Sequence, residues 1–193
     1  MSADPLPAEI ARPHMWLQPT TAKEPTGKVF ELERFDRHLL CDKDGLFPIN
    51  FNSSWEPAVL KAELKREDCI GWYRNPDRGS QDSLGVIYEE AGENRILRPD
   101  FVFFVRLADG GIVADLVDPH GDYLADAMPK LKGLAKYAEE HHTHFRRIEA
   151  VSKTKTGAFR MLDLTKASVR AEVLAASSAE GLYASSVATD YAQ

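Results

Sequence analysis

The stretch from Ile96 to Gly121, ILRPDFVFFVRLADGGIVADLVDPHG, constrains the fold more than any other part of this chain. Phe101–Val105 is an almost unbroken apolar run, which is typical of a strand buried on both faces, and Ile112–Val117 is a second apolar strand. Asp109-Gly110-Gly111 between them predicts a tight turn, because glycine adopts positive φ without steric cost. The sequence therefore predicts a β-hairpin.

This hairpin has a carboxylate at each of two strand ends. Asp100 directly precedes the first strand and Asp118 follows the second. The start of one antiparallel strand lies beside the end of its neighbour, so we expect Asp100 and Asp118 to meet at one edge of the sheet. Two converging carboxylates suit a hard divalent cation such as Mg²⁺. The alternative is that both are ordinary polar strand ends.

Length and composition limit the possible classes of protein. The 193 residues are enough for one domain, and 44% of them are hydrophobic, so a substantial core is expected. No apolar run approaches the roughly 18 residues that cross a membrane, and the first thirty residues lack a signal-peptide core, so we expect no membrane association. The two cysteines form no disulfide framework, which favours the cytoplasm.

The formal net charge of −6 bears on the partners of the chain. A free-standing protein that binds nucleic acid without specificity is usually basic, so this class is disfavoured. An enzyme with an acidic metal site is compatible with the charge. So is a domain whose grip on DNA is supplied by another part of a larger protein.

The chain is expected to consist of an N-terminal arm or linker (1–28), one domain (29–176) and a C-terminal tail that frays (177–193). Periodicity and capping signals predict helices over 53–66, 122–142 and 166–176. Strands are expected at 69–73, 83–88, 145–151 and 159–162 besides the hairpin, with 145–151 half-buried and 159–162 at the sheet edge. Residues 89–94 read as a turn. This order indicates an α/β sandwich with a mixed sheet flanked by helices.

The first of these helices is expected to be capped by Asn52-Ser53-Ser54. Its buried stripe is predicted to be Trp55, Val59, Leu60 and Leu64. Glu56 falls in the first turn, where a negative charge suits the helix dipole.

Several motifs together resemble a nuclease family. Pro99-Asp100 followed by Asp118-Pro119-His120 resembles the PD-(D/E)xK motif, with Asp118 in the place of the second acid and His120 in the place of the lysine. The region from Asn52 to Val151 resembles the nuclease region of type III restriction-enzyme-like proteins. The segments that carry this resemblance are WYRNP (72–76), LGVIY (84–88), RPDFV (98–102), KLKGLA (130–135) and, beyond that region, RMLDL (160–164).

The resemblance implies a restriction-endonuclease-like fold and a metal-dependent deoxyribonuclease that serves a restriction or defence system. Asp100 and Asp118 would hold Mg²⁺ or Mn²⁺, and Glu56 would complete the acidic set. The lysine's task would fall to His120 or to Lys130, or the site would be inactive and the domain would bind DNA or dock on a partner. No G-x-x-x-x-G-K-[ST] motif is present, so a helicase or translocase motor would be a separate domain or subunit.

Basic and polar residues outside the acidic set are candidate DNA contacts. Arg74 and Asn75 follow an aromatic strand and suit phosphates and base edges. Arg146, Lys153 and Lys155 form a basic group that either contacts phosphate or is a solvated face. The tract His141-His142-Thr143-His144 follows a helix end, where cationic histidines favour the dipole, and is read as surface rather than as a zinc site.

Overall fold

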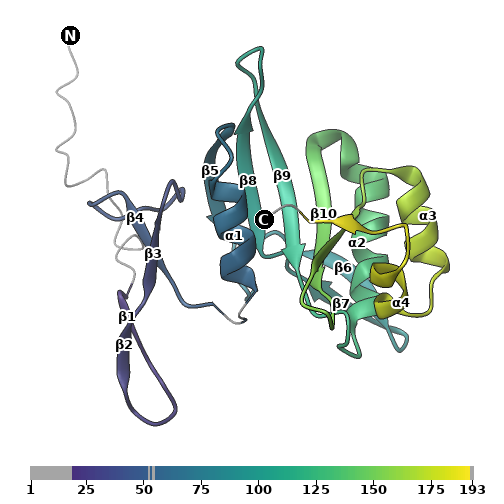
Figure 1. The fold of residues 1–193 in the computed structure, drawn as a ribbon, viewed down its shortest axis with the longest axis horizontal. Coiled ribbons are helices and arrows are strands. Elements are labelled where there is room, and N and C mark those ends of the chain that lie inside the picture. Colours follow the sequence, from purple (N-terminus) through teal and green to yellow (C-terminus); the bar gives the residue numbers. More distant parts are fainter. Residues whose placement is uncertain (1–18, 52, 54, 192–193) are drawn as a thin grey trace. The chain divides into compact units, whose positions relative to one another are not determined.

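The computed structural model describes residues 19–51, 53 and 55–191. They divide into two compact units, and the boundary between them in the sequence falls between residues 52 and 53 (Figure 1). The predicted boundaries differ: residues 29–52 belong with the N-terminal unit, and residues 177–191 belong with the larger one.

The N-terminal unit consists of two small antiparallel sheets. Its strands are β1 (Thr21–Lys23), β2 (Val29–Glu31), β3 (Glu33–Asp36) and β4 (Leu46–Ile49), paired β1–β2 and β3–β4. His38 stacks on Phe47 with ring centroids 3.6 Å apart, and burial lowers the pKa of His38 to about 3. Asp42 Oδ1 accepts hydrogen bonds from the backbone N–H of Asp44 and Leu46, which stabilises a turn before β4.

The larger unit is built on a six-stranded mixed sheet in the order β12-β11-β10-β9-β8-β5. Its elements in chain order are α1 (Glu56–Leu64), β5 (Cys69–Arg74), β6 (Val86–Glu90), β7 (Glu93–Leu97), β8 (Phe101–Arg106), β9 (Ile112–Pro119), α2 (Ala127–His141), a 3₁₀ turn (His142–His144), β10 (Phe145–Lys153), β11 (Phe159–Asp163), α3 (Ala167–Ala175), α4 (Ala179–Ala184) and β12 (Thr189–Asp190). All neighbours in the sheet are antiparallel except β9 and β10, which are parallel and are joined by α2. The predicted α/β class with a mixed sheet flanked by helices is confirmed.

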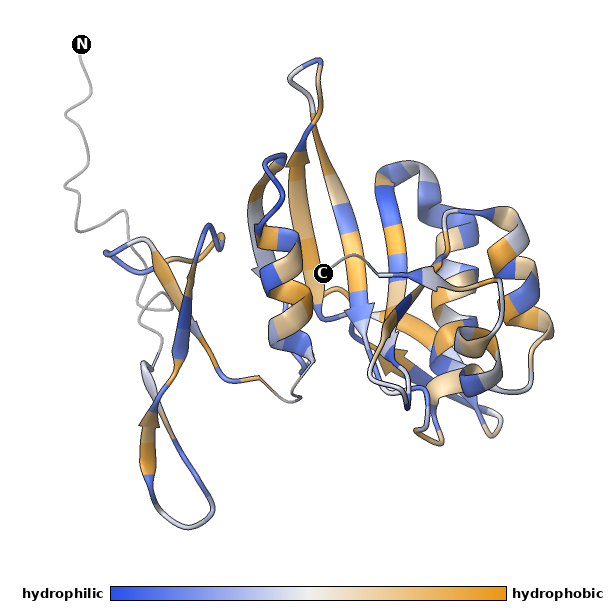
Figure 2. Ribbon diagram, in the orientation of Figure 1, coloured by the Kyte–Doolittle hydropathy of each residue, from blue (hydrophilic) through white to orange (hydrophobic). Residues whose placement is uncertain are grey.

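The predicted hairpin is β8–β9. Phe101 pairs with Val117 and Arg106 with Ile112, and Gly110 in the connecting turn has φ of +87°. Figure 2 shows these strands as largely apolar, and Phe101, Phe103 and Val105 are buried. The register places the start of β8 beside the end of β9, as the sequence predicts.

Helices cover both faces of the sheet, and each face has its own core. Helices α2, α3 and α4 pack on the face that presents Leu116, Ile148 and Leu162. Helix α1 contributes the buried Val59 and Leu60, and its Glu63 pairs with Arg147, which also pairs with Asp115 of the sheet. The aromatic rings of Trp72, Phe101 and Phe103 pack in series, with centroids 6.2 and 5.7 Å apart.

Several local predictions are wrong. Strand β10 is continuously buried from Ile148 to Ser152, because it lies between β9 and β11 with helices over it. The short strand β12 covers the outer side of β11, so β11 is not an edge. Within residues 89–94 only Ala91 and Gly92 form a turn, because the residues on either side belong to the paired strands β6 and β7 of a second hairpin.

The predicted fraying tail is also ordered structure. Helix α4 places Ala179, Leu182 and Tyr183 in the core, and its N-cap Ser178 accepts a hydrogen bond from the Gly181 N–H. The 177–191 segment is therefore part of the domain.

Candidate functional site

Three acidic side chains approach one another at the edge of the sheet where β8 starts and β9 ends. Asp118 Oδ1 accepts a hydrogen bond of 3.2 Å from the Asp100 backbone N–H. Glu56, the first residue of α1, reaches the same place and is 3% exposed.

The buried side of α1 differs from the predicted stripe. Trp55 and Leu64 are only half-buried, whereas Glu56 and Glu63 are buried and form ion pairs.

Arg74 joins two of these acids. Its Nη2 lies 2.7 Å from Glu56 Oε2 and 3.1 Å from Asp100 Oδ1. Arg74 is the last residue of β5 and pairs with Phe101, so the antiparallel register brings it to the start of β8. Its guanidinium carbon also lies 4.8 Å from the Phe101 ring centroid, a cation–π distance. Arg74, predicted as a DNA contact, is thus placed inside the acidic site.

The site is short of positive charge. Burial is the main cause that raises the pKa of the Asp100 carboxyl to about 8; the Arg74 charge opposes this rise, Asp118 and Glu56 add to it, and Lys130 opposes it weakly. Asp100 is therefore largely protonated near neutral pH. A further cation at this place would favour its ionised form.

His120 is held against Asp118. Its Nδ1 lies 3.1 Å from Asp118 Oδ2, within hydrogen-bond distance. His120 Nε2 is buried without a hydrogen-bond partner among the residues that the structure describes. The Tyr183 ring of α4 packs edge-on to His120 at 6.2 Å between centroids, and its hydroxyl is likewise buried without a partner in the described chain.

Lys130 lies near the site but is engaged elsewhere. Its Nζ is 2.6 Å from Asp126 Oδ2, one turn earlier on α2. Burial would lower the pKa of Lys130, but the hydrogen bond and charge of Asp126 outweigh it, and the pKa is raised. Lys130 therefore acts electrostatically on Asp100, but its ammonium group is ion-paired with Asp126.

The other predicted DNA contacts lie in three different settings. Asn75 is buried; its amide donates to the carbonyls of Leu84 and Pro99, and its Oδ1 accepts from the Leu84 N–H. This corrects the sequence interpretation, because an amide committed to the backbone holds the loop after β5 and does not face a ligand. Arg146 likewise donates hydrogen bonds to Asp115 and Asp68. It lies near the start of β10, and the acidic site lies toward the other end of that strand.

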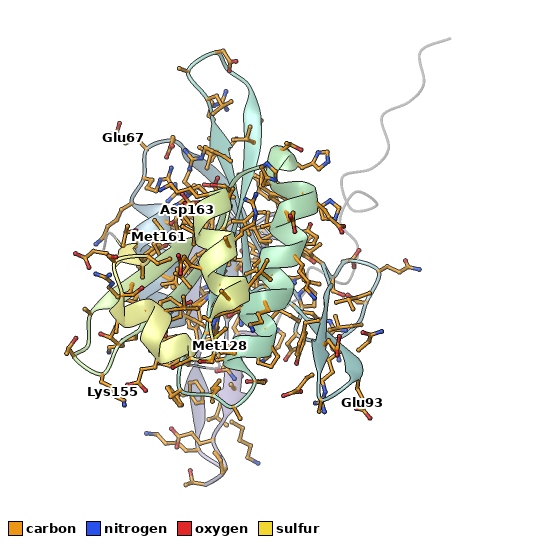
Figure 3. All side chains as sticks on the ribbon, turned by 90° about the vertical axis from the view of Figure 1, so that its right-hand side faces the viewer. Glu67, Glu93, Met128, Lys155, Met161 and Asp163 are labelled. Atoms are coloured by element: carbon orange, nitrogen blue, oxygen red, sulfur yellow. The ribbon has the colours of Figure 1, made fainter. Side chains whose placement is uncertain are left out.

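Lys153 and Lys155 follow the part of β10 that lies beside the end of β9. Val151 of β10 pairs with Pro119 of β9, and the Val151 carbonyl accepts from the His120 N–H at 2.9 Å. The carboxyl ends of these parallel strands therefore meet at one edge, and Lys153 and Lys155 follow it. Figure 3 shows Lys155 on the outside of the unit, where its Nζ lies 2.7 Å from Glu180.

A second charged cluster lies on the α1 face. Glu63 accepts from Arg66, from Arg147 at 2.6 Å and from the Tyr191 hydroxyl, and Asp115 accepts from Arg146 and Arg147. Asp115 is fully buried, so its ion pairs are shielded from water. This network fixes α1, and with it Glu56, against β9 and β10.

The residues of the acidic site have the donor chemistry of a divalent-cation site, but they are arranged around a guanidinium. Three carboxylates from three elements supply oxygen ligands of the kind that Mg²⁺ takes. Within the described residues, no group of three or more His, Cys, Asp or Glu side chains is close enough to hold a metal ion together. Instead, Glu56 and Asp100 are each at ion-pair distance from the Arg74 guanidinium, which lies between them.

The fold and site define a mixed α/β protein with an acidic, arginine-bridged site at one edge of its sheet. Residues 36–192 match the YagJ family. The chain is also 46% identical over 191 residues to Protein YagJ of Escherichia coli (strain K12), an alignment that covers 99% of this chain and 77% of that protein. The chain therefore belongs to the YagJ family. No solved structure matches it significantly.

The described residues contain no helix that is long and apolar enough to cross a membrane.

Proposed function

We propose that this chain is a metal-dependent endonuclease domain that hydrolyses DNA phosphodiester bonds in the cytoplasm. The observation that carries the proposal is the convergence of Glu56, Asp100 and Asp118 from α1, the start of β8 and the end of β9. The order of elements supports it: a helix, an antiparallel group of strands, a second helix and a parallel strand. This is the order that the resemblance to restriction-endonuclease-like proteins implies.

Each residue has a task in this proposal. Glu56, Asp100 and Asp118 would hold Mg²⁺ or Mn²⁺. When bound, such an ion lowers the pKa of a water molecule and offsets the charge that develops on the phosphate. His120, held by Asp118, would accept a proton through Nε2, and Lys153 and Lys155 would bind phosphates of the DNA backbone. A helicase or translocase motor in another domain or subunit would deliver the DNA.

A cleavage assay on plasmid and single-stranded DNA tests this function. We expect nicking or cutting with Mg²⁺ or Mn²⁺ that EDTA abolishes and that is lost in Asp100→Ala and in Asp118→Ala. Asp109→Ala is the matched control, because it removes a carboxylate from the exposed turn of the same hairpin. Full activity in both site variants would refute the proposal, provided that circular dichroism shows the variants folded.

One observation favours a second function, a catalytically inactive module that binds DNA or docks on a partner. Arg74 already contacts Glu56 and Asp100 within the protein, and His120 stands where the resemblance expects a lysine. DNA binding without metal-dependent turnover would support this alternative. In that case His120→Lys is expected to restore weak cleavage, whereas it is expected to change little if Lys130 already serves.

A further inference from the structure

The Arg74 guanidinium lies between two of the acidic side chains that would hold a metal ion. Its Nη2 touches one oxygen of Glu56 and one oxygen of Asp100 at 2.7 and 3.1 Å. Mg²⁺ binds carboxylate oxygens at about 2.0–2.1 Å and requires near-octahedral geometry. A guanidinium nitrogen and a magnesium ion cannot both lie between these two oxygens.

The position of Arg74 is well defined by its surroundings. Its side chain is only 13% exposed. Its backbone pairs with that of Phe101 in the neighbouring strand β8, and its guanidinium lies over the Phe101 ring. Among the groups that act on Asp100, Arg74 is the strongest source of positive charge and Lys130 the weaker one. Arg74 is thus the main cation beside these carboxyl groups.

Arginine also suits the substrate of the proposed reaction. A guanidinium binds phosphate with two parallel hydrogen bonds, as it binds a carboxylate. Arg74 ends β5 and precedes the loop of residues 75–85, so its side chain starts at the edge of the sheet where Lys153 and Lys155 also lie. Release from Glu56 and Asp100 would leave its charge beside an incoming DNA backbone.

We propose that Arg74 is a built-in competitor of the metal ion: it closes the acidic site in the free protein and leaves it for a phosphate when metal binds. This inference rests on the proposed nuclease function and adds its regulation. Metal and nucleic acid then strengthen each other's binding, because each favours the state in which Arg74 has left the carboxylates.

Titration calorimetry with Mn²⁺ alone tests the competition without any measurement of cleavage. We expect Arg74→Gln to bind Mn²⁺ more tightly than the wild-type protein, by roughly 5- to 150-fold, the usual range for coupled sites. Arg74→Lys keeps a positive charge and is expected to stay much closer to wild type. Arg78→Gln is the matched control, because it removes a charge from an exposed position of the following loop and is expected to leave the affinity unchanged.

The outcomes separate this inference from the proposed function. Equal or weaker Mn²⁺ binding by folded Arg74→Gln, with measurable binding by wild type, would overturn the competition and leave the metal site intact. Absence of Mn²⁺ binding in wild type and in every variant would overturn both proposals.

A second measurement uses the wild-type protein and does not depend on how the Gln variant folds. Addition of Mg²⁺ is expected to shift the side-chain ¹⁵N resonance of Arg74, which is assigned from its loss in Arg74→Lys. An Arg74 resonance that stays fixed while Mg²⁺ binds would also overturn the competition.

Discussion

Glu149 provides a quantitative test of the charged network that holds α1 in place. Its carboxyl lies on the buried central strand β10, with Oε2 3.1 Å from Arg147 Nη1. Burial is the main cause that raises the pKa of Glu149, from 4.5 to about 7, against the lowering effect of Arg147. The negative charges of Glu63, Asp163 and Asp115 add to the rise.

The expected change in stability follows from this pKa. Below pH about 4.5 both states hold the proton, so Glu149 contributes no difference. Between pH about 4.5 and 7 the unfolded chain releases the proton while the folded protein retains it, so the free energy of unfolding falls. A shift from 4.5 to about 7 corresponds to a loss of about 3 kcal/mol, complete above pH about 7.

Urea unfolding of the wild-type protein and of Glu149→Gln between pH 4 and 8 measures this loss, and other titrating groups largely cancel in the comparison. Glutamine keeps an oxygen that can accept from Arg147 but does not titrate. We expect the wild-type protein to lose about 3 kcal/mol relative to the variant as the pH rises, with most of the loss between pH about 4.5 and 7. A constant difference would show that Glu149 is not protonated at neutral pH in the folded protein and would refute the reasoning.

Three further predictions concern the site and its support. Gly133→Ala is expected to destabilise the protein by about 1–3 kcal/mol, because the new Cβ would lie 3.2 Å from Tyr88 Cα and closer still to its Cβ; an unchanged melting temperature would contradict this. Asn75→Ala is expected to cost about 1–3 kcal/mol by leaving backbone groups of Leu84 and Pro99 without partners, and equal urea midpoints for variant and wild type would argue against it. Because Asp100 has a pKa of about 8, metal must displace a proton, so we expect Mn²⁺ affinity to fall about tenfold per pH unit below 8 in calorimetry; a flat profile between pH 6 and 8 would count against this protonation state.

The sequence alone predicts the arrangement that brings Asp100 and Asp118 together. Their adjacency follows from two apolar runs and a glycine turn, which are local features with a fixed antiparallel geometry. Glu56 in the first turn of α1 is likewise confirmed in position. The predicted cap is wrong, because the N-cap of α1 is Trp55 without a side-chain cap hydrogen bond, although Ser53 Oγ accepts from the Glu56 N–H; residues 52 and 54 lie outside the described residues. The alternation of helices and strands is enough to give the α/β class.

Other features of the site depend on contacts between segments remote in sequence. The sequence marks Arg74 as the end of a strand, but only the pairing of β5 with β8 places it between Glu56 and Asp100. Asn75 has the residue type of a DNA contact, and only its buried environment shows that its amide binds backbone.

The sequence by itself determined the class of fold and the meeting of two carboxylates at a strand boundary, because both follow from local pattern and backbone geometry. Only the tertiary structure decided which charges lie beside them and which residues form the second charged cluster. Glu63, Asp115 and Arg147 come from three separate elements, and Tyr183 comes from a helix that sequence periodicity does not distinguish from a fraying tail. Ion pairs and ring contacts of this kind act over a few ångströms in space, so spacing along the chain carries no signal for them.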